Sequence, residues 1–236
     1  MLKLDDSAAA LRRLLTPPQC LLCRTPLTND LARGLLCNGC ENDLPWNTSA
    51  CPSCALPQSS ASICARCQKR PPPFDAAWAA FRFAPPIRQS ILSLKYHAGF
   101  MQARWLGETM AAQLAQRAAT LPDLLLPVPL HPGRLRRRGY NQALELTRVL
   151  AHRLAIDCDP RAACRLRATA DQIGQSAAAR RRNLRGVFSV APRVAGRRVA
   201  LVDDVMTTGS TLAELTRCCR KVGAASIEVW VAARTV

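Results

Sequence analysis

The sequence predicts an α/β protein in which a parallel sheet with helices on both faces follows a small, cysteine-rich N-terminal module. Three observations lead to this prediction. Eight of the twelve cysteines lie in the first 67 residues, three prolines begin at Pro71, and from about residue 77 short apolar stretches alternate with amphipathic ones. Such an alternation is typical of a parallel sheet whose crossover connections are helices.

The 236 residues divide into four expected segments, which are a helical segment over 1–19, the cysteine-rich module over 20–70, a proline-rich linker over 71–76 and the α/β domain over 77–236. Successive prolines continue neither a helix nor an inner strand, so they predict a stiff spacer. No apolar stretch approaches the roughly 18 residues of a membrane span, and the N-terminus is acidic where an export signal is basic. We therefore expect a cytoplasmic protein without membrane insertion.

The cysteines of the module form four Cys-x-x-Cys pairs: Cys20/Cys23, Cys37/Cys40, Cys51/Cys54 and Cys64/Cys67. Two residues between thiolates let both sulfurs reach one tetrahedral ion, so two pairs complete a zinc site. The eight cysteines predict two structural Zn²⁺ sites, whose closed shells leave no position for catalysis. Disulfides are the alternative, but they require an oxidising compartment, which the sequence does not indicate.

Two ligand pairings fit this spacing. Consecutive pairs would join 20/23 with 37/40 and 51/54 with 64/67, whereas interleaved pairs would join 20/23 with 51/54 and 37/40 with 64/67. We expect the consecutive pairing, because the intervals between successive pairs are those of short ribbon hairpins. The module has few large apolar side chains, so its fold should depend on the metal.

The first half of the α/β domain begins with alternating residues over 78–83, which predict a strand. Pro85-Pro86 then opens a helix that reaches about Tyr96. A second helix over 101–118 follows from apolar residues at helical spacing. The apolar run 124–128 stops at prolines, as a buried parallel strand does where it meets a functional loop.

The second half of the domain contains an amphipathic stretch over 141–154, which predicts another helix. An apolar strand at 199–202, a helix over 210–222 and a strand at 227–231 follow near the C-terminus. The order of these elements is that of a parallel sheet covered on both faces.

The stretch 199–211 combines an apolar strand, two acids, a loop of small hydroxyl residues and a helix. The loop Thr207-Thr208-Gly209-Ser210-Thr211 allows backbone N–H groups and hydroxyls to approach a phosphate, and the helix N-terminus adds a favourable dipole. Asp203 and Asp204 cannot bind that phosphate, but carboxylates accept hydrogen bonds from sugar hydroxyls. The stretch therefore predicts a ribose-5-phosphate site. It contains neither a Walker loop nor a G-x-G-x-x-G fingerprint.

This stretch resembles the phosphoribosyl-pyrophosphate signature of type I phosphoribosyltransferases. The resemblance extends to the ComF family of competence-associated proteins, from about Cys20 to Arg234. It rests on the four Cys-x-x-Cys pairs and on Leu94-Lys95-Tyr96, Pro127-Val128-Pro129-Leu130, Arg138-Gly139-Tyr140-Asn141-Gln142, and Gln172 with Arg182-Asn183. The family implies a double zinc ribbon followed by a type I phosphoribosyltransferase-like domain, and a link to DNA uptake in naturally transformable bacteria.

The resemblance also implies roles for individual residues. Asp203 and Asp204 would hold the ribose hydroxyls of phosphoribosyl pyrophosphate, and residues 207–211 its 5-phosphate. The pyrophosphate would lie at Pro129-Leu130-His131, with Arg134, Arg137 and Arg138 just beyond. A hood is expected over residues 166–186. Magnesium would be held by the ligand's oxygens and by water, so no carboxylate cage is needed.

The reaction that the resemblance implies is displacement of pyrophosphate at the anomeric carbon, with transfer of the phosphoribosyl group to an acceptor. The protein would position the donor, neutralise the pyrophosphate and exclude water. The residues indicate neither a general base nor the identity of the acceptor.

The charge of the chain suggests a further partner. The formal net charge is +17, and the segment from His131 to Arg198 contains sixteen arginines but only four acidic residues. These arginines would allow the protein to bind single-stranded DNA or to contact a DNA-uptake helicase. The alternative is that they form a solvated charged face around an anion pocket. The function is thus expected to be that of a phosphoribosyltransferase, or else that of a DNA-handling or partner-docking factor that uses the site only to sense a ligand. The oligomeric state stays open.

Overall fold

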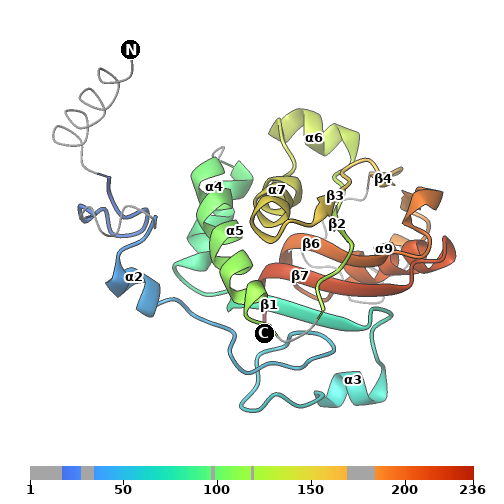
Figure 1. Ribbon diagram of the computed structural model, residues 1–236, viewed down its shortest axis with the longest axis horizontal. Coiled ribbons are helices and arrows are strands. Elements are labelled where there is room, and N and C mark those ends of the chain that lie inside the picture. The colour runs from blue at the N-terminus through green and yellow to red at the C-terminus, as the bar shows by residue number, and fades with distance from the viewer. Residues whose placement is uncertain (1–17, 28–34, 97–98, 118–119, 169–183) are drawn as a thin grey trace. The chain divides into compact units, whose positions relative to one another are not determined.

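The computed structural model describes residues 18–27, 35–96, 99–117, 120–168 and 184–236 (Figure 1). The chain divides into two compact units, Met1–Leu44 and Pro45–Val236. This division lies inside the cysteine-rich module and not at the expected proline linker, so the second half of that module belongs to the larger unit. Most of the helical segment expected over 1–19 lies outside the described residues.

The larger unit is built on a five-stranded sheet with the strand order β1-β7-β6-β2-β3. All four neighbouring pairs are parallel, which confirms the predicted fold class. The strands are β1 (Ala76–Arg82), β2 (Leu124–Pro127), β3 (Asp157–Cys158), β6 (Arg198–Met206) and β7 (Ser226–Arg234). Because β1 is an outer strand and β2 lies beyond β6, the connection from β1 to β2 passes two strands, β7 and β6.

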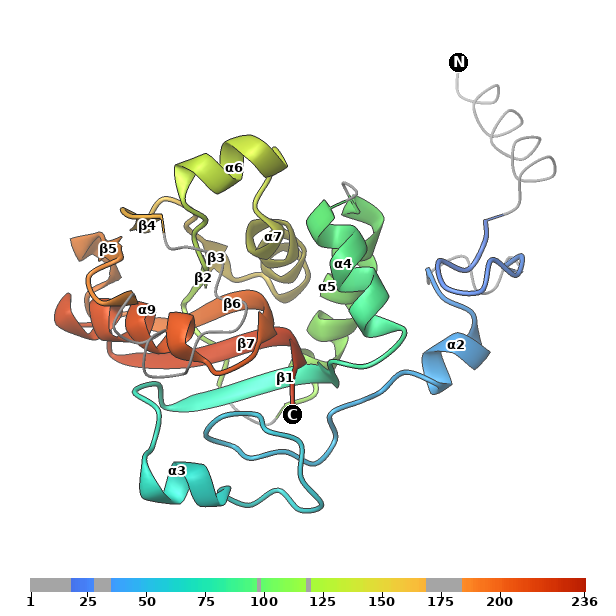
Figure 2. The same ribbon diagram turned by 180° about the vertical axis from the view of Figure 1, so that it is seen from behind.

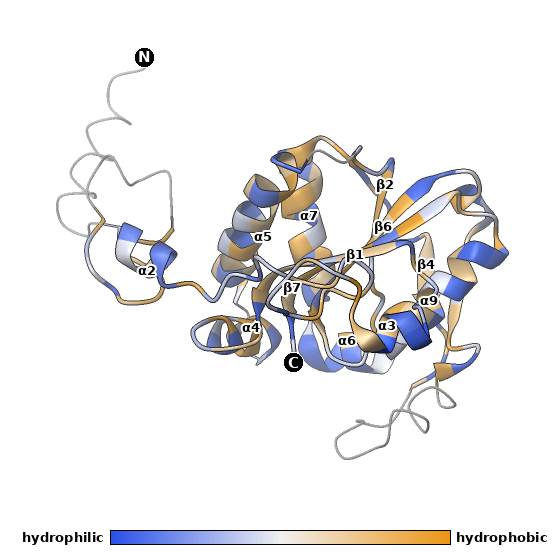
Figure 3. Ribbon diagram, turned by 90° about the horizontal axis from the view of Figure 1, so that it is seen from below, coloured by the Kyte–Doolittle hydropathy of each residue, from blue (hydrophilic) through white to orange (hydrophobic). Residues whose placement is uncertain are grey.

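Helices cover both faces of this sheet, as Figures 1 and 2 show from opposite sides. One layer contains α4 (Ile87–Tyr96), α5 (Phe100–Ala115) and α7 (Gln142–Leu154), while α9 (Ser210–Lys221) lies on the other face. Helices α5 and α7 carry both hydrophobic and hydrophilic residues (Figure 3), as helices with one packed face do. The predicted helix boundaries differ from these by only a few residues.

The two long central strands are almost entirely buried. Residues 199–202 of β6 and 227–231 of β7 are apolar apart from Glu228, and their apolar side chains are at most 1% exposed. Strand β6 is longer than the apolar run predicts, because its pairing with β7 continues to Met206, opposite Arg234. Asp203 and Asp204 therefore lie within the strand and not after it.

Short elements between the long ones were not predicted. Helix α6 (Pro132–Arg138) follows β2, and β4 (Ala163–Arg165) pairs antiparallel with β5 (Phe188–Val190). A 3₁₀ turn spans Pro192–Val194. Segments of three to seven residues carry too little periodicity to be recognised in a sequence.

The β4–β5 pair borders the region where a hood is expected. Residues 169–183, with Gln172, Arg182 and Asn183, lie outside the described part of the chain. The expected hood over 166–186 is therefore described only at its two ends.

The outer edge of β1 is covered by the segment that begins the larger unit. The Asn47 N–H donates to the Ala80 carbonyl at 2.9 Å, the Arg82 N–H to Pro45 at 2.8 Å and the Ala77 N–H to Pro52 at 3.0 Å. An outer strand with free N–H and C=O groups is otherwise a site for unwanted pairing. This pairing explains why the boundary falls at Leu44. Among the described residues, no helix has the length and apolar character needed to cross a membrane.

Candidate functional site

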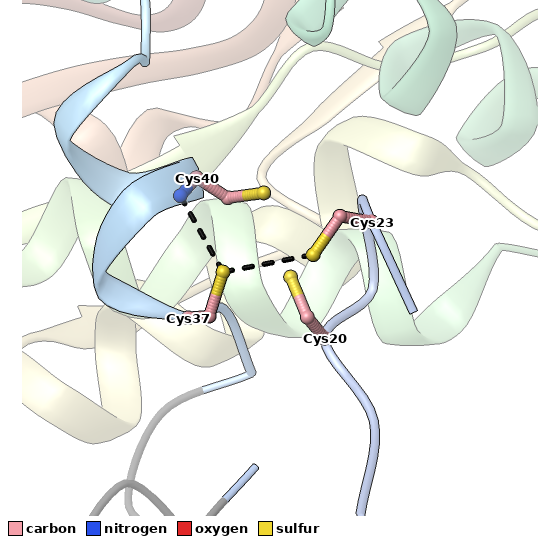
Figure 4. A group of neighbouring side chains, drawn as sticks. All are labelled: Cys20, Cys23, Cys37 and Cys40. Carbon is pink, nitrogen blue, oxygen red and sulfur yellow. Dashed lines mark hydrogen bonds between the residues drawn. The ribbon is translucent and has the colours of Figure 1, made fainter. Parts of the chain in front are cut away.

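The eight N-terminal cysteines form two groups of four, one in each unit. Within each group the sulfur atoms all lie within 4.8 Å of one another, and the groups are Cys20, Cys23, Cys37 and Cys40, and Cys51, Cys54, Cys64 and Cys67. The pairs are therefore grouped consecutively, as expected, and not interleaved. Figure 4 shows the four sulfurs of the first group turned toward a common centre.

The sulfur separations fit a tetrahedral metal site. Four ligands about 2.3 Å from one ion stand about 3.8 Å apart, and the structure places the Cys23 and Cys37 sulfurs 3.6 Å apart and those of Cys54 and Cys64 3.7 Å apart. Backbone N–H groups also point at sulfur, from Cys40 to Cys37 at 3.5 Å and from Cys64 to Cys51 at 3.4 Å. Both groups are thus suited to zinc.

The same backbone turn builds both groups. Arg24 and Ala55 each follow the second cysteine of a pair, and both adopt a left-handed conformation, with φ of 63° and 53°. The N–H of the first cysteine then donates across the turn at 2.9 Å, from Cys20 to Thr25 and from Cys51 to Leu56. The third cysteine of each group precedes a short helix, α2 (Asn38–Asn42) or α3 (Ala65–Lys69).

The thiols of one group do not ionise independently. Hydrogen bonding with Thr25 lowers the pKa of Cys23 to about 6, whereas burial and the neighbouring cysteines raise the pKa of Cys40. In the second group burial acts to raise the pKa of Cys51, but backbone N–H groups outweigh it and bring that pKa to about 7, while burial raises the pKa of Cys67. Four adjacent thiolates need a cation between them, and a divalent metal supplies it.

A second candidate site lies at the carboxyl end of β6. Asp203 is half-buried and Asp204 is 3% exposed. The Asp203 Oδ1 accepts a hydrogen bond from the backbone N–H of Asp204 at 2.9 Å. Burial and the neighbouring Asp204 carboxylate raise the pKa of Asp203 well above its ordinary value. The two neighbouring acids therefore lie in different environments.

Lys95 neutralises the more deeply buried acid. Its Nζ lies 2.6 Å from the Asp204 Oδ2, and the two side chains are 25% and 4% exposed. Although burial acts to lower the pKa of Lys95, the attraction of Asp204, with a contribution from Asp203, raises it above its usual value. Sequence analysis identified Lys95 only as part of a family motif, because this contact joins α4 to β6.

The hydroxyl-rich loop follows the acids directly. Gly209 has a φ of 74°, and a side chain there would come within 3.3 Å of the Met206 sulfur, so the turn requires glycine. The Thr208 and Ser210 hydroxyls lie 2.9 Å apart, and Ser210 begins α9. The first N–H groups of a helix have no partner within it, so they can bind an anion. A cavity of about 50 Å³ lies in this loop, lined by Asp203 and residues 205–212.

The loop after β2 lies at the same carboxyl-terminal end of the parallel strands as the acids of β6. Leu126 pairs with Leu201, and the Val128 N–H donates to the Val202 carbonyl at 2.9 Å. Pro129 is buried, and Leu130 and His131 are half-buried. The chain departs to opposite sides of the sheet after β2 and after β6, and ligands bind at such a switch point in open α/β sheets.

The residues beyond this loop are held by helix α6. His131 is the N-cap residue, and its Nδ1 accepts from the Gly133 N–H at 3.1 Å. Arg137 is exposed on the helix. Arg138 donates to the Gln142 Oε1 at 2.6 Å and lies 5.5 Å from the centre of the Tyr96 ring, next to the segment that carries Lys95.

Two residues after α6 fix the position of this region. The Tyr140 hydroxyl donates to the Leu94 carbonyl, and Asn141 caps α7 while its Nδ2 donates to the Val128 carbonyl at 3.0 Å. Both lie in the motif that begins at Arg138, and both act on the backbone. In the sequence, these roles are indicated by the two polar residues Tyr140 and Asn141 at the start of a predicted helix.

Arg165 of β4 interacts electrostatically with Asp203. Burial and the nearby Arg134 lower the pKa of Arg165, whereas Asp203 acts to raise it. The guanidinium lies 5.7 Å from the centre of the Phe188 ring. Neither Arg165 nor Lys95 could be assigned to the acidic pair from sequence spacing.

Comparison with known families and proteins is consistent with this geometry. Residues 11–68 match the double zinc ribbon domain, and residues 106–235 match the phosphoribosyl transferase domain. The chain is 37% identical over 228 residues to DNA utilization protein YhgH of Salmonella typhimurium, which covers 94% of this chain and all of that protein. It is also 37% identical over 228 residues to competence protein F of Haemophilus influenzae, covering 92% and 96%.

Among solved structures, the chain resembles glutamine phosphoribosylpyrophosphate amidotransferase from B. subtilis. The TM-score is 0.40 at 20% identity, and the match covers 59% of this chain and 30% of that one. On the family matches and the two long sequence alignments together, this chain belongs to the ComF family of competence-associated proteins, which join a double zinc ribbon to a phosphoribosyltransferase domain.

Proposed function

We propose that this protein binds phosphoribosyl pyrophosphate together with Mg²⁺ and acts in the uptake or utilization of DNA. The ligand is supported by one observation above all. The acidic pair and hydroxyl loop of β6 and the loop after β2 meet at a switch point of the sheet. The link to DNA is supported by the names of the relatives, DNA utilization protein YhgH and competence protein F.

In this proposal each part of the ligand has its own group of residues. The carboxylates of Asp203 and Asp204 accept hydrogen bonds from the 2′- and 3′-hydroxyls of the ribose. Residues 207–211 hold the 5-phosphate through N–H groups, hydroxyls and the α9 N-terminus. The pyrophosphate lies along residues 129–131, with Arg137 and Arg138 as cationic neighbours. Mg²⁺ is shared between the ligand's oxygens and water.

The proposed reaction transfers the phosphoribosyl group. The C–O bond at the anomeric carbon breaks, its electron pair leaves with the pyrophosphate, and a lone pair of the acceptor forms the new bond. The protein's residues bind and orient the donor, and cations stabilise the negative charge that develops on the leaving group. The alternative is a factor that binds the same ligand as a signal without breaking this bond.

Calorimetric titration of phosphoribosyl pyrophosphate with Mg²⁺ tests the binding step. We expect the Asp203→Asn, Asp204→Asn double variant to bind at least about 100-fold more weakly, because hydrogen bonds to charged groups contribute roughly 1.5–3 kcal/mol each. Asp157→Asn is the matched control, since that side chain is 80% exposed. Equal affinities of the wild type and the double variant would overturn the assignment of these acids.

Release of pyrophosphate in the presence of a panel of bases and amines tests the reaction. Release that depends on one acceptor, and that the double variant lacks, supports transfer. Binding without release in the whole panel would favour the sensing alternative.

A direct role in DNA binding is a second candidate, favoured by the sixteen arginines between His131 and Arg198. Arg136 and Arg137 of α6 are exposed. Affinity for single-stranded DNA should fall steeply between about 50 and 200 mM salt if several phosphates are contacted. Binding that is insensitive to salt would exclude this mode, and a protein partner such as a helicase would then be the link to DNA.

A further inference from the structure

A buried arginine connects the second cysteine group (Cys51, Cys54, Cys64 and Cys67) to the phosphate loop (residues 207–211). Arg234, the last residue of β7, is 2% exposed. Its Nε donates to the carbonyl of Cys54 and its Nη1 to the carbonyl of Met206, both at 3.1 Å. Cys54 is a member of the second cysteine group, and Met206 directly precedes the loop 207–211. One rigid guanidinium therefore spans the two sites.

Among the described residues, no acid balances the charge of Arg234. Within the described part of the chain no carboxylate lies within ion-pair distance of its guanidinium. Its remaining bonds go to the carbonyl and hydroxyl of Thr235. A buried cation needs a counter-charge. The cysteines that fit zinc would supply it, because an ion held by four thiolates carries a net charge of −2.

The phosphate loop and the second cysteine group line one cavity. The cavity has a volume of about 270 Å³, and its lining residues include Cys54 and Cys67 as well as Thr208, Gly209 and Ser210. Arg66, between two of the cysteines, donates to the Thr208 carbonyl at 3.4 Å. The hydrogen bonds of Arg66 and Arg234 therefore link the loop and the residue before it to the second cysteine group.

We infer that Arg234 is a positioning residue that couples the second zinc site to the phosphate loop, so that zinc and the phosphorylated ligand bind cooperatively. The ligand named here is that of the proposed function, and the inference rests on it in that respect. Coupling of this kind is reciprocal. If the phosphorylated ligand raises the affinity of the second group for zinc, zinc must raise the affinity of the loop for the ligand by the same factor.

The first test uses the full-length protein with both zinc ions bound. Zinc release to a colorimetric indicator is followed with and without phosphoribosyl pyrophosphate and Mg²⁺. A Cys23→Ser, Cys40→Ser variant, which lacks the first site, assigns the kinetic phases. We expect the ligand to slow release from the second group at least about fivefold, the lower end of typical coupling, and to leave the first group unchanged. Equal protection of both groups, or of neither despite measured binding, would overturn the coupling.

The second test needs no ligand and so separates this inference from the proposed function. Arg234→Lys keeps the charge but loses the planar fork. Arg82→Lys is its matched control, because Arg82 is the exposed register partner of Arg234 on β1. We expect Arg234→Lys alone to release zinc from the second group about tenfold faster and to increase hydrogen exchange of the peptide 207–213.

The outcomes of this second test are distinct. Unchanged exchange and release in Arg234→Lys would refute the positioning role even if the ligand binds. Faster exchange in a protein that binds no phosphoribosyl pyrophosphate would instead refute the proposed function and retain the role of Arg234. If Arg234→Lys fails to fold, hydrogen exchange of the peptide 207–213 is measured in the wild type before and after zinc removal. Coupling predicts that its exchange increases when zinc is removed, and unchanged exchange would refute the inference.

Discussion

Lys95 of α4 and Asp204 of β6 form an ion pair near the carboxyl end of that strand, with 2.6 Å between the lysine Nζ and the carboxylate Oδ2. The second acid, Asp203, has no such cation at that distance among the described ion pairs. Its pKa is raised by burial and by Asp204. At the residue scale, the site therefore contains one acid that is paired with a lysine and one whose ionisation opposes folding.

Removing Lys95 should destabilise the larger unit. Lys95→Met leaves Asp204 buried without its counter-charge, and breaking a buried pair in this way typically costs about 3–5 kcal/mol. Urea unfolding measures the loss, and Lys69→Met on the exposed side of α3 is the control. Adding Asp204→Asn to Lys95→Met should restore part of the stability, and a double variant no more stable than Lys95→Met would contradict this account of the pair.

Asp203 should make stability depend on pH in a defined direction. Its pKa is higher in the folded protein than in the unfolded chain, so its contribution to stability is present at acid pH and is lost as the pH rises through the folded value. We expect Asp203→Asn to raise the urea midpoint at pH 8 and to leave it nearly unchanged at pH 4. Ligand affinity of the wild type should rise with pH over the same range, because the carboxylate is the form that accepts hydrogen bonds.

At the scale of elements, the loop between β6 and α9 depends on one backbone conformation. Gly209 adopts a φ of 74°, close to the 73° of Gly196. The two glycines differ in their surroundings, since a side chain at Gly196 would meet no atom within 4 Å, whereas one at Gly209 would meet Met206. They therefore allow conformational strain to be separated from an effect on the site.

Alanine at either glycine should cost about 1 kcal/mol of stability, because both need a left-handed backbone. Only Gly209→Ala is expected to weaken the binding of phosphoribosyl pyrophosphate, by about tenfold or more. Thermal unfolding and calorimetry measure the two effects. Equal loss of affinity in Gly196→Ala would show that general destabilisation, and not the loop, is responsible.

At the scale of the whole molecule, the two cysteine groups belong to units of different size. The described part of Met1–Leu44 buries few large apolar side chains, chiefly Leu27, Leu36 and Leu44, whereas the larger unit has the sheet and its helices. Small modules with so little core depend on metal to fold.

Zinc removal should therefore affect the two units unequally. After chelation we expect residues 18–27 and 35–44 to lose protection from hydrogen exchange completely, while the central strands β6 and β7 keep theirs. Exchange measured by mass spectrometry on the full-length protein resolves the two. A metal-free protein that protects residues 18–27 and 35–44 as before would contradict the dependence on zinc.

The sequence by itself determined the types of the long elements, because each depends on local spacing. The Cys-x-x-Cys pairs predicted two metal sites, and the apolar strand with its acids and hydroxyl loop predicted the site at β6. Only the tertiary structure decided which segments meet: that β2 lies beside β6, that Lys95 pairs with Asp204, and that residues 45–52 complete the edge of β1. These contacts join residues far apart in the chain, where the pattern of neighbours in the sequence carries no information about distance in space.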